Sequence, residues 1–447
     1  MNFFKYQVYF CLFVAAIGMN SCVVQDPYTG VAPGMWRGVL YLEGKEISKI
    51  KTSTKDDFSE QYVAGQLPFN FEVVYDSKDK FHIDIINGSE RIKVDNIEFG
   101  RNRFKERRDT LRMNFPIYNT HISAIFEDKV MEGWYVPASG SNYKIKFVAK
   151  HGQSFRFTEL KNLPSVDVTG KWAAVFGLDK PAKEHEPAVG EFQQKGTDLT
   201  GTFMTETGDY RFLQGTVQQK KVGGKTVDKL FLSCFDGSHA FLFEALAGKD
   251  RLDGAFWSGG QYKTTWVAER NANARLRAAD SLTSLKAGAS FNFSGLDGDG
   301  KRRSLNDAAW NGKIKVVQVL GTWCPNCLDE TKFMMEYLGK NPNNNVAVIG
   351  LGYEKSHQPS ARIAKLMAYK KQLQLPYTVL DAGFASADSA AASLPMLNTI
   401  MSFPTTVILD KNNKVRKIYT GFSGPATSEY TKYKAEFAAL IQKIAAE

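Results

Sequence analysis

Alternating hydrophobic and polar residues dominate the chain from about residue 35 to residue 270. Short runs such as FNFEVVY, FHIDII, YKIKFVA and KLFLSCF alternate in this way, and Gly, Asn and Asp separate them. Period-two alternation with such breaks is typical of β-strands that bury one face. The pattern therefore predicts an all-β region built from many short strands.

The β region contains an internal repeat, in which three pairs of segments resemble each other. The pairs are residues 130–150 with 251–269, residues 111–121 with 230–239, and the segments around Trp36 and Trp172. Self-similarity at this spacing indicates two related structural units. We expect two β-meander or barrel-like units, in residues 35–165 and 166–270.

The pattern changes after residue 270. Residues 271–286 (NANARLRAADSLTSLK) have the composition and spacing of a connecting helix, and we expect a helical linker there. From residue 287 to 447, strand-like runs such as KVVQVL and TTVILD alternate with helix-like runs such as ARIAKLMAYKKQLQ. Such alternation predicts an α/β fold, so the whole chain is expected to be multidomain.

The first 21 residues have the features of a secretion signal. They hold one positive charge and an apolar run, VYFCLFVAAIGM, that is too short to span a bilayer comfortably. The next residue, Cys22, follows a small residue, and this arrangement resembles a bacterial lipoprotein signal, although Asn20 departs from its usual pattern. The resemblance implies lipidation of Cys22, followed by a tether over residues 22–34; an ordinary cleaved signal peptide is the alternative.

Charge and composition narrow the possible partners. The formal net charge is +10, which could favour anionic lipid headgroups or acidic partners. The sequence contains no helix-turn-helix, zinc-finger or aromatic-basic motif, so we expect no nucleic-acid partner. Together with the predicted signal and anchor, this indicates a protein held by lipid at the periplasmic or extracytoplasmic face of the cell envelope.

Five cysteines are present, and two of them fall in the predicted signal and anchor. Cys234 lies at an alternating position with Leu230 and Leu232, which predicts the inward face of a strand and a role as a small apolar side chain. The other two, Cys324 and Cys327, form a CxxC motif within GTWCPNCLDE.

The CxxC motif falls between a predicted strand and a predicted helix. Unpaired N–H groups and the positive end of a helix stabilise a thiolate at this position, so Cys324 should have a lowered pKa and be nucleophilic. Cys327 should be more buried and should resolve the mixed disulfide. A structural zinc site needs about four ligands and the sequence offers no second pair, so we expect no metal. A structural disulfide closing so small a loop would stabilise little.

Several segments together resemble the TlpA/ResA-like branch of the thioredoxin superfamily over residues 287–447. These are GTWCPNC, the expected opening hairpin FNFSGLDGDGKRRSLND, the SFPTTVILD segment and the closing KVRKIYTGFSGP segment. The resemblance implies that Pro404 is a cis-proline facing the dithiol and that Trp323 shields it. It also implies that the backbone of Phe403 pairs with an extended substrate, with Pro325 and Asn326 as further substrate contacts.

Two positions depart from the thioredoxin pattern. Gln318 stands where many thioredoxins carry a buried Asp, and Lys332 stands where many carry a helix-kinking proline. ResA-like proteins often place a Glu three residues after the second cysteine, and Glu330 stands there. We therefore hypothesise that Glu330 tunes and deprotonates Cys327; the alternative is a first-turn Glu that only favours the helix N-terminus.

The sequence thus predicts a lipid-anchored thiol–disulfide oxidoreductase that reduces protein disulfides through Cys324 and Cys327. We expect no bound cofactor, and a membrane or periplasmic thiol donor as the source of electrons. Two alternatives stay open: a thioredoxin-fold peroxide reductase, and an envelope lipoprotein whose β repeats bind a partner or a glycan.

Overall fold

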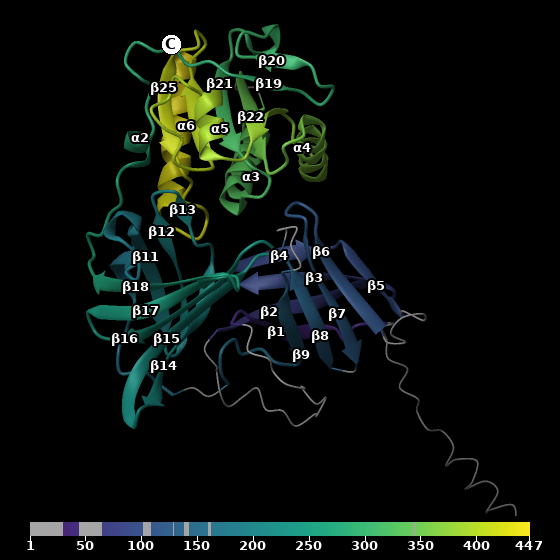
Figure 1. Ribbon diagram of the computed structural model, residues 1–447, viewed down its shortest axis with the longest axis vertical. Coiled ribbons are helices and arrows are strands. Elements are labelled where there is room, and N and C mark those ends of the chain that lie inside the picture. Colours follow the sequence, from purple (N-terminus) through teal and green to yellow (C-terminus); the bar gives the residue numbers. More distant parts are fainter. Residues whose placement is uncertain are drawn as a thin grey trace, which may run out of the picture.

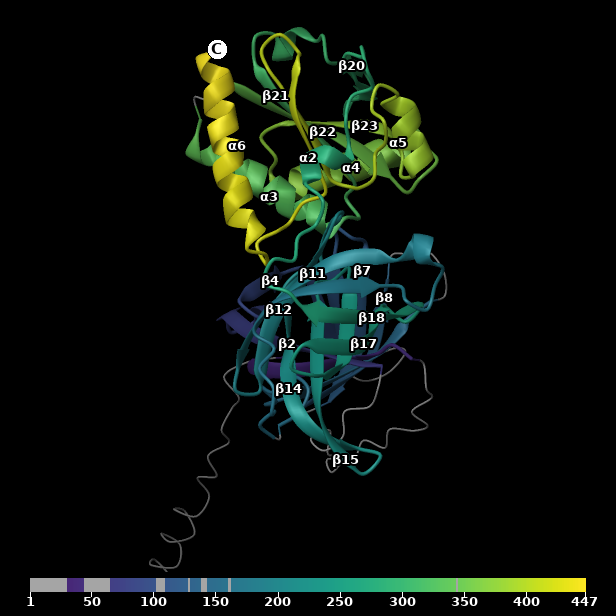
Figure 2. The same cartoon turned by 90° about the vertical axis from the view of Figure 1, so that its left-hand side faces the viewer.

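The computed structural model describes residues 30–43, 65–101, 109–127, 129–137, 143–159, 162–342 and 345–447. The predicted signal peptide, Cys22 and most of the predicted tether lie outside these ranges. A C-terminal α/β region lies over two β units that stand beside each other (Figures 1 and 2). Within the described ranges, no helix is both long enough and apolar enough for a membrane crossing.

The first β unit is a nine-stranded antiparallel sheet in the order β4-β3-β2-β1-β9-β8-β7-β6-β5. Its inward faces form a single hydrophobic core. The first strand pairs with the last, which is how a meander curls back on itself to become barrel-like. Its strands are β1 Gly34–Tyr41, β2 Gln66–Ser77, β3 Lys80–Asn87, β4 Glu90–Val94, β5 Ile97–Arg101, β6 Asp109–Phe115, β7 Thr120–Glu127, β8 Val130–Val136 and β9 Ile145–His151.

The second β unit is also a nine-stranded sheet, and an additional pairing between β11 and β12 closes it into a barrel. Closure removes the unpaired strand edges that an open sheet exposes. Its strands are β10 Gly170–Phe176, β11 Glu186–Lys195, β12 Asp198–Thr205, β13 Gly208–Asp209, β14 Leu213–Val222, β15 Lys225–Phe235, β16 Ala240–Ala247, β17 Arg251–Ser258 and β18 Tyr262–Arg270; a short 3-10 helix covers Ala182–Glu184.

The two units share a structural detail that supports the repeat seen in the sequence. Trp36 and Trp172 are both fully buried in the first strand of their unit, where that strand pairs with the last one. Each indole Nε1 donates a 2.9 Å hydrogen bond to the carbonyl of the residue four positions earlier, Ala32 or Val168. An indole N–H that is buried needs such an acceptor, so each Trp fixes the segment that enters its unit.

Strand β15 belongs to the cores of both β units, because one of its faces is buried in each unit. Leu230, Leu232 and Cys234 point into the core of the second unit, whereas Phe231 and Phe235 belong to the core of the first. The inward position predicted for Cys234 is therefore confirmed.

The C-terminal region contains a seven-stranded sheet in the order β20-β19-β23-β22-β21-β24-β25, with β21, β22 and β23 parallel. This is the thioredoxin-type arrangement that the sequence predicted. Its elements are α2 Ala279–Leu282, β19 Ser294–Leu296, β20 Arg302–Ser304, a 3-10 helix Ala308–Trp310, β21 Ile314–Leu320, α3 Pro325–Lys340, β22 Val346–Glu354, α4 Pro359–Leu373, β23 Thr378–Phe384, α5 Ala387–Ser393, β24 Thr405–Leu409, β25 Val415–Thr420 and α6 Glu429–Ala446.

Hydrophobic side chains cover both faces of this sheet. Helices α3, α4 and α6 pack on one face, while α5 and residues around Trp310 pack on the other. The central strand β21 is buried along its whole length, which suits a strand with parallel and antiparallel neighbours.

The linker differs from its prediction. The helix expected over residues 271–286 is confined to the four residues Ala279–Leu282. Ala274 and Leu276 instead pack against Val189 and Met204 of the second β unit. A helix nucleus is costly in so short a segment, so burial of these side chains on the barrel decides its conformation.

Candidate active site

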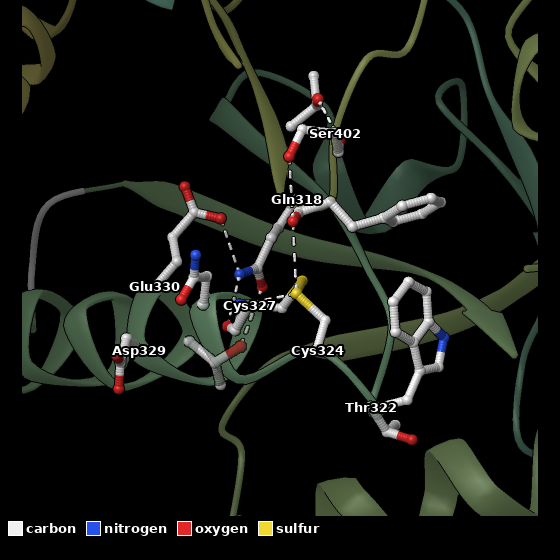
Figure 3. The surroundings of a disulfide bond; sticks show 12 residues. Gln318, Thr322, Cys324, Cys327, Asp329, Glu330 and Ser402 are labelled. Atoms are coloured by element: carbon white, nitrogen blue, oxygen red, sulfur yellow. Dashed lines mark hydrogen bonds between the residues drawn. A yellow bond between two sulfur atoms is a disulfide. The ribbon is translucent and has the colours of Figure 1, made fainter. Parts of the chain in front are cut away.

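The two cysteines of the CxxC motif form a disulfide where strand β21 leads into helix α3 (Figure 3). Their Cα atoms are 5.2 Å apart. Cys324 is the N-cap residue of α3, and Pro325 occupies the first turn, where its missing N–H is not needed. The disulfide therefore lies at the N-terminus of α3, where the first backbone N–H groups of the helix have no partner within the helix.

The sulfur of Cys324 receives a direct contact from the helix end. The backbone N–H of Cys327 donates a 3.1 Å hydrogen bond to Cys324 Sγ, in the manner of an N-cap. The same donor would stabilise a thiolate after reduction, together with the helix dipole. On its other side, Cys324 Sγ lies 3.4 Å from the carbonyl oxygen of Phe403.

Phe403 and Trp323 form the apolar border of the disulfide. The Phe403–Pro404 peptide bond is cis, as predicted. The rings of Trp323 and Phe403 meet edge to face with centroids 5.5 Å apart, and Trp323 Nε1 donates to the carbonyl of Tyr353 at 2.9 Å. Both aromatic side chains pack against the cysteine pair and Leu320, which limits the access of water to the sulfurs.

Glu330 is completely buried beneath the dithiol, on the core-facing side of α3. Its carboxylate accepts hydrogen bonds from Thr406 Oγ1 at 2.8 Å and Gln318 Nε2 at 2.9 Å, and a longer one from Tyr433 at 3.4 Å. Burial raises the pKa of Glu330 to about 7, although these three hydrogen bonds act to lower it. A first-turn Glu that only favours the helix end would not need this enclosure.

Gln318, the departure from the thioredoxin pattern, connects Glu330 to the second cysteine. Its Nε2 atom donates to Glu330 and also lies 3.3 Å from the carbonyl oxygen of Cys327. Its Oε1 atom accepts from Thr331 Oγ1 at 3.2 Å. The amide has no charge of its own, so Glu330 supplies the carboxyl group beneath this dithiol.

The opposite side of α3 carries a second buried acid, Asp329, which turns toward the β units. Arg211 of the second β unit forms an ion pair with Asp329 and a 2.8 Å ion pair with Glu90 of the first unit. Asp236, from the turn after β15, lies 3.5 Å from Arg211 Nε. Burial acts against the charge of Arg211, but Glu90 and Asp236, together with Tyr118 and Asp209, outweigh it and raise its pKa. One guanidinium thus links all three parts of the molecule.

The structure brings Trp323, Cys324, Pro325, Asn326, Cys327, Glu330, Phe403 and Pro404 together around the dithiol. Sequence reasoning missed Thr406 and Tyr433, which bind Glu330, and the contacts from the second β unit. Thr406 follows Pro404 closely, so it could have been found by asking what binds a buried Glu. Arg211 and Asp329 offered no such signal, because their partners lie far apart in sequence.

Cys234 lies far from the dithiol, in the core of another part of the molecule. It is fully buried in the core of the second β unit, and burial raises the pKa of its thiol well above the ordinary value. No group of three or more potential metal ligands was found among the residues that the structure describes.

Comparisons with known proteins concern the C-terminal region. The Redoxin family model matches residues 281–434. The thioredoxin-like protein YneN of Bacillus subtilis (strain 168) is 30% identical over 122 residues, which are 27% of this chain and 64% of that protein. The chain thus spans somewhat less than two thirds of this relative. The thiol:disulfide interchange protein DsbE of Escherichia coli (strain K12) is 25% identical over 154 residues, covering 33% of this chain and 74% of that protein.

Among solved structures, a thiol:disulfide interchange protein of the thioredoxin family from Chlorobium tepidum TLS is 21% identical and covers 36% of this chain and 99% of its own, with a TM-score of 0.26. The curated relatives are by name a thioredoxin-like protein and a thiol:disulfide interchange protein. Together with the family match, they support the prediction that this chain is an oxidoreductase.

Proposed function

We propose that this chain is a thiol–disulfide oxidoreductase of the TlpA/ResA-like kind, which reduces protein disulfides outside the cytoplasm. The observation that carries the proposal is the Cys324–Cys327 pair at the start of α3, with its N-cap hydrogen bond. The apolar border of Trp323 and Phe403 supports it, because a substrate disulfide needs a surface that excludes water from the reacting sulfurs.

The proposed reaction begins with the reduced dithiol. The Cys324 thiolate attacks one sulfur of the substrate disulfide, and the other substrate sulfur leaves as a thiolate and takes a proton. Cys327 then loses its proton and attacks Cys324 Sγ, which closes the Cys324–Cys327 disulfide and releases the second substrate thiol. Two electrons pass to the substrate, and a membrane or periplasmic thiol donor returns the protein to its dithiol form.

Glu330 is the proposed acceptor of the Cys327 proton. The two residues lie three positions apart in α3 and therefore share one side of the helix. A carboxyl group whose pKa is about 7 is half ionised near neutral pH, which suits a group that must both take and return a proton. We propose that Phe403 pairs by its backbone with an extended substrate, that Pro325 and Asn326 contact it, and that no bound cofactor is needed.

The decisive experiment is reduction of a disulfide-containing peptide by the reduced protein. Cys324→Ser should abolish the reaction, whereas Cys327→Ser should accumulate a mixed disulfide with the substrate. A reduction potential of about −270 mV would fit a protein that reduces its substrates. A reduction potential of about −120 mV would indicate the oxidative direction. Turnover of peroxide in place of the peptide would contradict the proposal.

The predicted domains and anchor complete the proposal. We propose a signal peptide over residues 1–21, lipid attached to Cys22, β units over residues 35–165 and 166–270, and a thioredoxin-like domain over residues 287–447. Two acyl chains give stable anchoring, whereas one gives only marginal binding. Cys22→Ala should therefore move the protein from the membrane fraction to the soluble fraction, and an unchanged distribution would contradict the anchor.

A further inference from the structure

A turn of the second β unit contacts residues that adjoin the dithiol. Three segments of the C-terminal region lie on this side: the start of α3, which holds the disulfide, the loop before Pro404, and residues 421–424 after β25, where Gly421 donates its N–H to the carbonyl oxygen of Pro404. The turn between β12 and β13, residues 205–208, contacts or adjoins all three. We call residues 205–208 the β12–β13 turn; Figure 1 shows its strands beneath the α/β region.

Two hydrogen bonds connect this turn and β13 to residues beside the sulfurs. Ser402 Oγ, whose residue adjoins Phe403, donates to the carbonyl oxygen of Thr207 at 3.0 Å. Asn326, between the two cysteines, donates from Nδ2 to the carbonyl oxygen of Asp209 at 3.4 Å. Both acceptors belong to the backbone of the second β unit. A side chain predicted to contact substrate is therefore already in contact with the barrel.

Two glycines allow this close approach. A Cβ atom added to Gly208 would lie 1.8 Å from Asn326 Nδ2. On the other side of the contact, Gly421 has a φ of +73°, and a Cβ atom there would lie 2.8 Å from the carbonyl oxygen of Glu206. Backbone meets backbone at this point, so no space is left for a peptide between them.

The β12–β13 turn is held firmly in this position. The Asp209 carboxylate accepts from the backbone N–H of Gly424 in the C-terminal region and from that of Arg211. Arg211 then continues into its ion pairs with Asp329 and Glu90. A buried cation with several carboxylate partners resists separation, because leaving any of them unpaired in the interior is costly.

Contacts elsewhere also hold the C-terminal region on both β units. Lys365 Nζ donates to the carbonyl oxygens of Pro116 and Ile117 in the first unit, at 3.0 and 2.8 Å. Ser428, before α6, donates from its backbone and its hydroxyl to Glu191 of the second unit. These contacts therefore hold the C-terminal region, which carries the dithiol, on both β units.

The opposite border of the dithiol is more open. Trp323 is partly exposed there, and the ammonium group of Lys355 lies 5.0 Å from the centre of its ring. Cys324 itself is only 7% exposed. Little of Cys324 is therefore open to solvent, and we infer that a substrate sulfur reaches it between Trp323 and the β12–β13 turn.

We propose that the β12–β13 turn is a fixed wall of the substrate site that admits only disulfides carried on short or extended chain segments. This inference rests on the proposed function and names its substrate class. A disulfide on the flat surface of a folded protein would bring neighbouring surface into collision with the turn. An extended segment presents only its own width, so its sulfur can reach Cys324 Sγ.

The test variant shortens the wall without touching the dithiol. Residues 205–208 are replaced by Asn-Gly, which suits a two-residue hairpin turn and keeps the pairing of Met204 with Asp209. A matched control makes the same replacement at residues 222–225, the exposed turn between β14 and β15 of the same barrel. Circular dichroism and thermal melting verify that both variants fold.

Two substrates present the same disulfide in different settings. One is a short disulfide-bonded peptide, and the other is the same peptide fused at both ends into the surface of a folded carrier protein. We expect the wild type and the control to strongly prefer the free peptide. The shortened wall should speed reaction with the carrier by roughly tenfold, equivalent to about 1.4 kcal/mol, with the free-peptide rate changed less than about twofold.

The proposal would be overturned if all three proteins preferred the free peptide to the same degree. It would also be overturned if shortening the turn raised the reduction rates of both substrates equally. A second measurement separates this outcome from failure of the proposed function. The reduced proteins are alkylated at Cys324 with iodoacetamide and with a maleimide coupled to a folded carrier. The wall predicts that shortening accelerates only the bulky reagent, whether or not the protein reduces disulfides. An unchanged ratio of the two alkylation rates refutes the wall.

Discussion

Asp329 and Glu330 are neighbours in helix α3, yet their side chains enter two different regions of the molecule. Asp329 turns toward the β units, where it meets the permanent cation of Arg211. Glu330 turns into the core of the C-terminal region, where its partners are the neutral donors Thr406, Gln318 and Tyr433. Both side chains are buried, so their environments differ mainly in the charge of their partners.

The charge of the partners affects the pKa of a buried carboxyl, as Asp236 and Glu330 illustrate. In the Arg211 region, burial would raise the pKa of Asp236, but His239 and Arg211 outweigh burial and lower it. In the Glu330 region, burial prevails over neutral hydrogen bonds and raises the pKa to about 7. Arg211 does not hold the pKa of every acid beside it below the ordinary value, because burial prevails at Glu90 and raises its pKa.

Removing the positive charge of Arg211 should have the largest effect on stability, because the carboxylates around it lose their partner. Arg211→Met leaves Asp329, Glu90 and Asp236 without their shared partner, and loss of one member of a buried ion pair costs about 3–5 kcal/mol. We expect a clear fall in the melting temperature and earlier proteolysis between the β units and the C-terminal region. Arg251→Met, which breaks only exposed ion pairs, should cost less than about 1 kcal/mol. Similar melting of both variants would contradict this account of the Arg211 region.

Glu330→Gln should change how stability depends on pH. The unfolded carboxyl ionises near 4.5, whereas the folded one keeps its proton until about pH 7. Because the folded state binds the proton more tightly, wild-type stability should fall as pH rises from about 4.5 to 7, by about 3 kcal/mol from this group. The variant should lose this decline, as measured by denaturant titrations at pH 5 and pH 8.

The same variant tests the proton acceptor proposed for Cys327. Disulfide reduction should slow by roughly tenfold or more near neutral pH, and the rise of the rate around pH 7 should disappear. An unchanged pH profile would assign Glu330 a purely structural part.

Thr406→Val should have the smallest effect. It removes the hydroxyl that donates to Glu330 Oε1, with little change in shape. We expect a cost of about 1–2 kcal/mol at pH 8, where the acceptor is charged, and a smaller one at pH 5. Removing this donor should also move the pKa of Glu330 further upward. In a Glu330→Gln background the pH-dependent part of the cost should vanish, and its persistence would indicate a different cause.

The sequence was sufficient for the elements whose signals are local. Strand alternation and the Trp36 and Trp172 repeats predicted two β units, and CxxC with a distant Pro-Thr predicted the C-terminal fold. The resemblance to ResA-like proteins was also sufficient to single out Glu330, which stands three residues after Cys327. Local helix propensity failed in residues 271–286, since packing of Ala274 and Leu276 on the barrel decided the conformation there.

The contacts between regions could not be predicted in the same way. Arg211, Glu90 and Asp329 are separated by more than 100 residues from one another, and nothing in their local patterns marks them as partners. The local sequence of residues 205–208 is that of an ordinary hairpin connection. Its place beside the dithiol follows only from how the barrel and the α/β region pack together.

The buried Trp36 has a mechanical consequence. Strand β1, which it anchors, lies between β2 and β9 and pairs with both of them. A force applied to the chain ahead of Gly34 would draw β1 lengthwise between its neighbours, so its hydrogen bonds would share the load in shear instead of opening one after another. The β unit that follows the N-terminal segment is thus built to withstand tension.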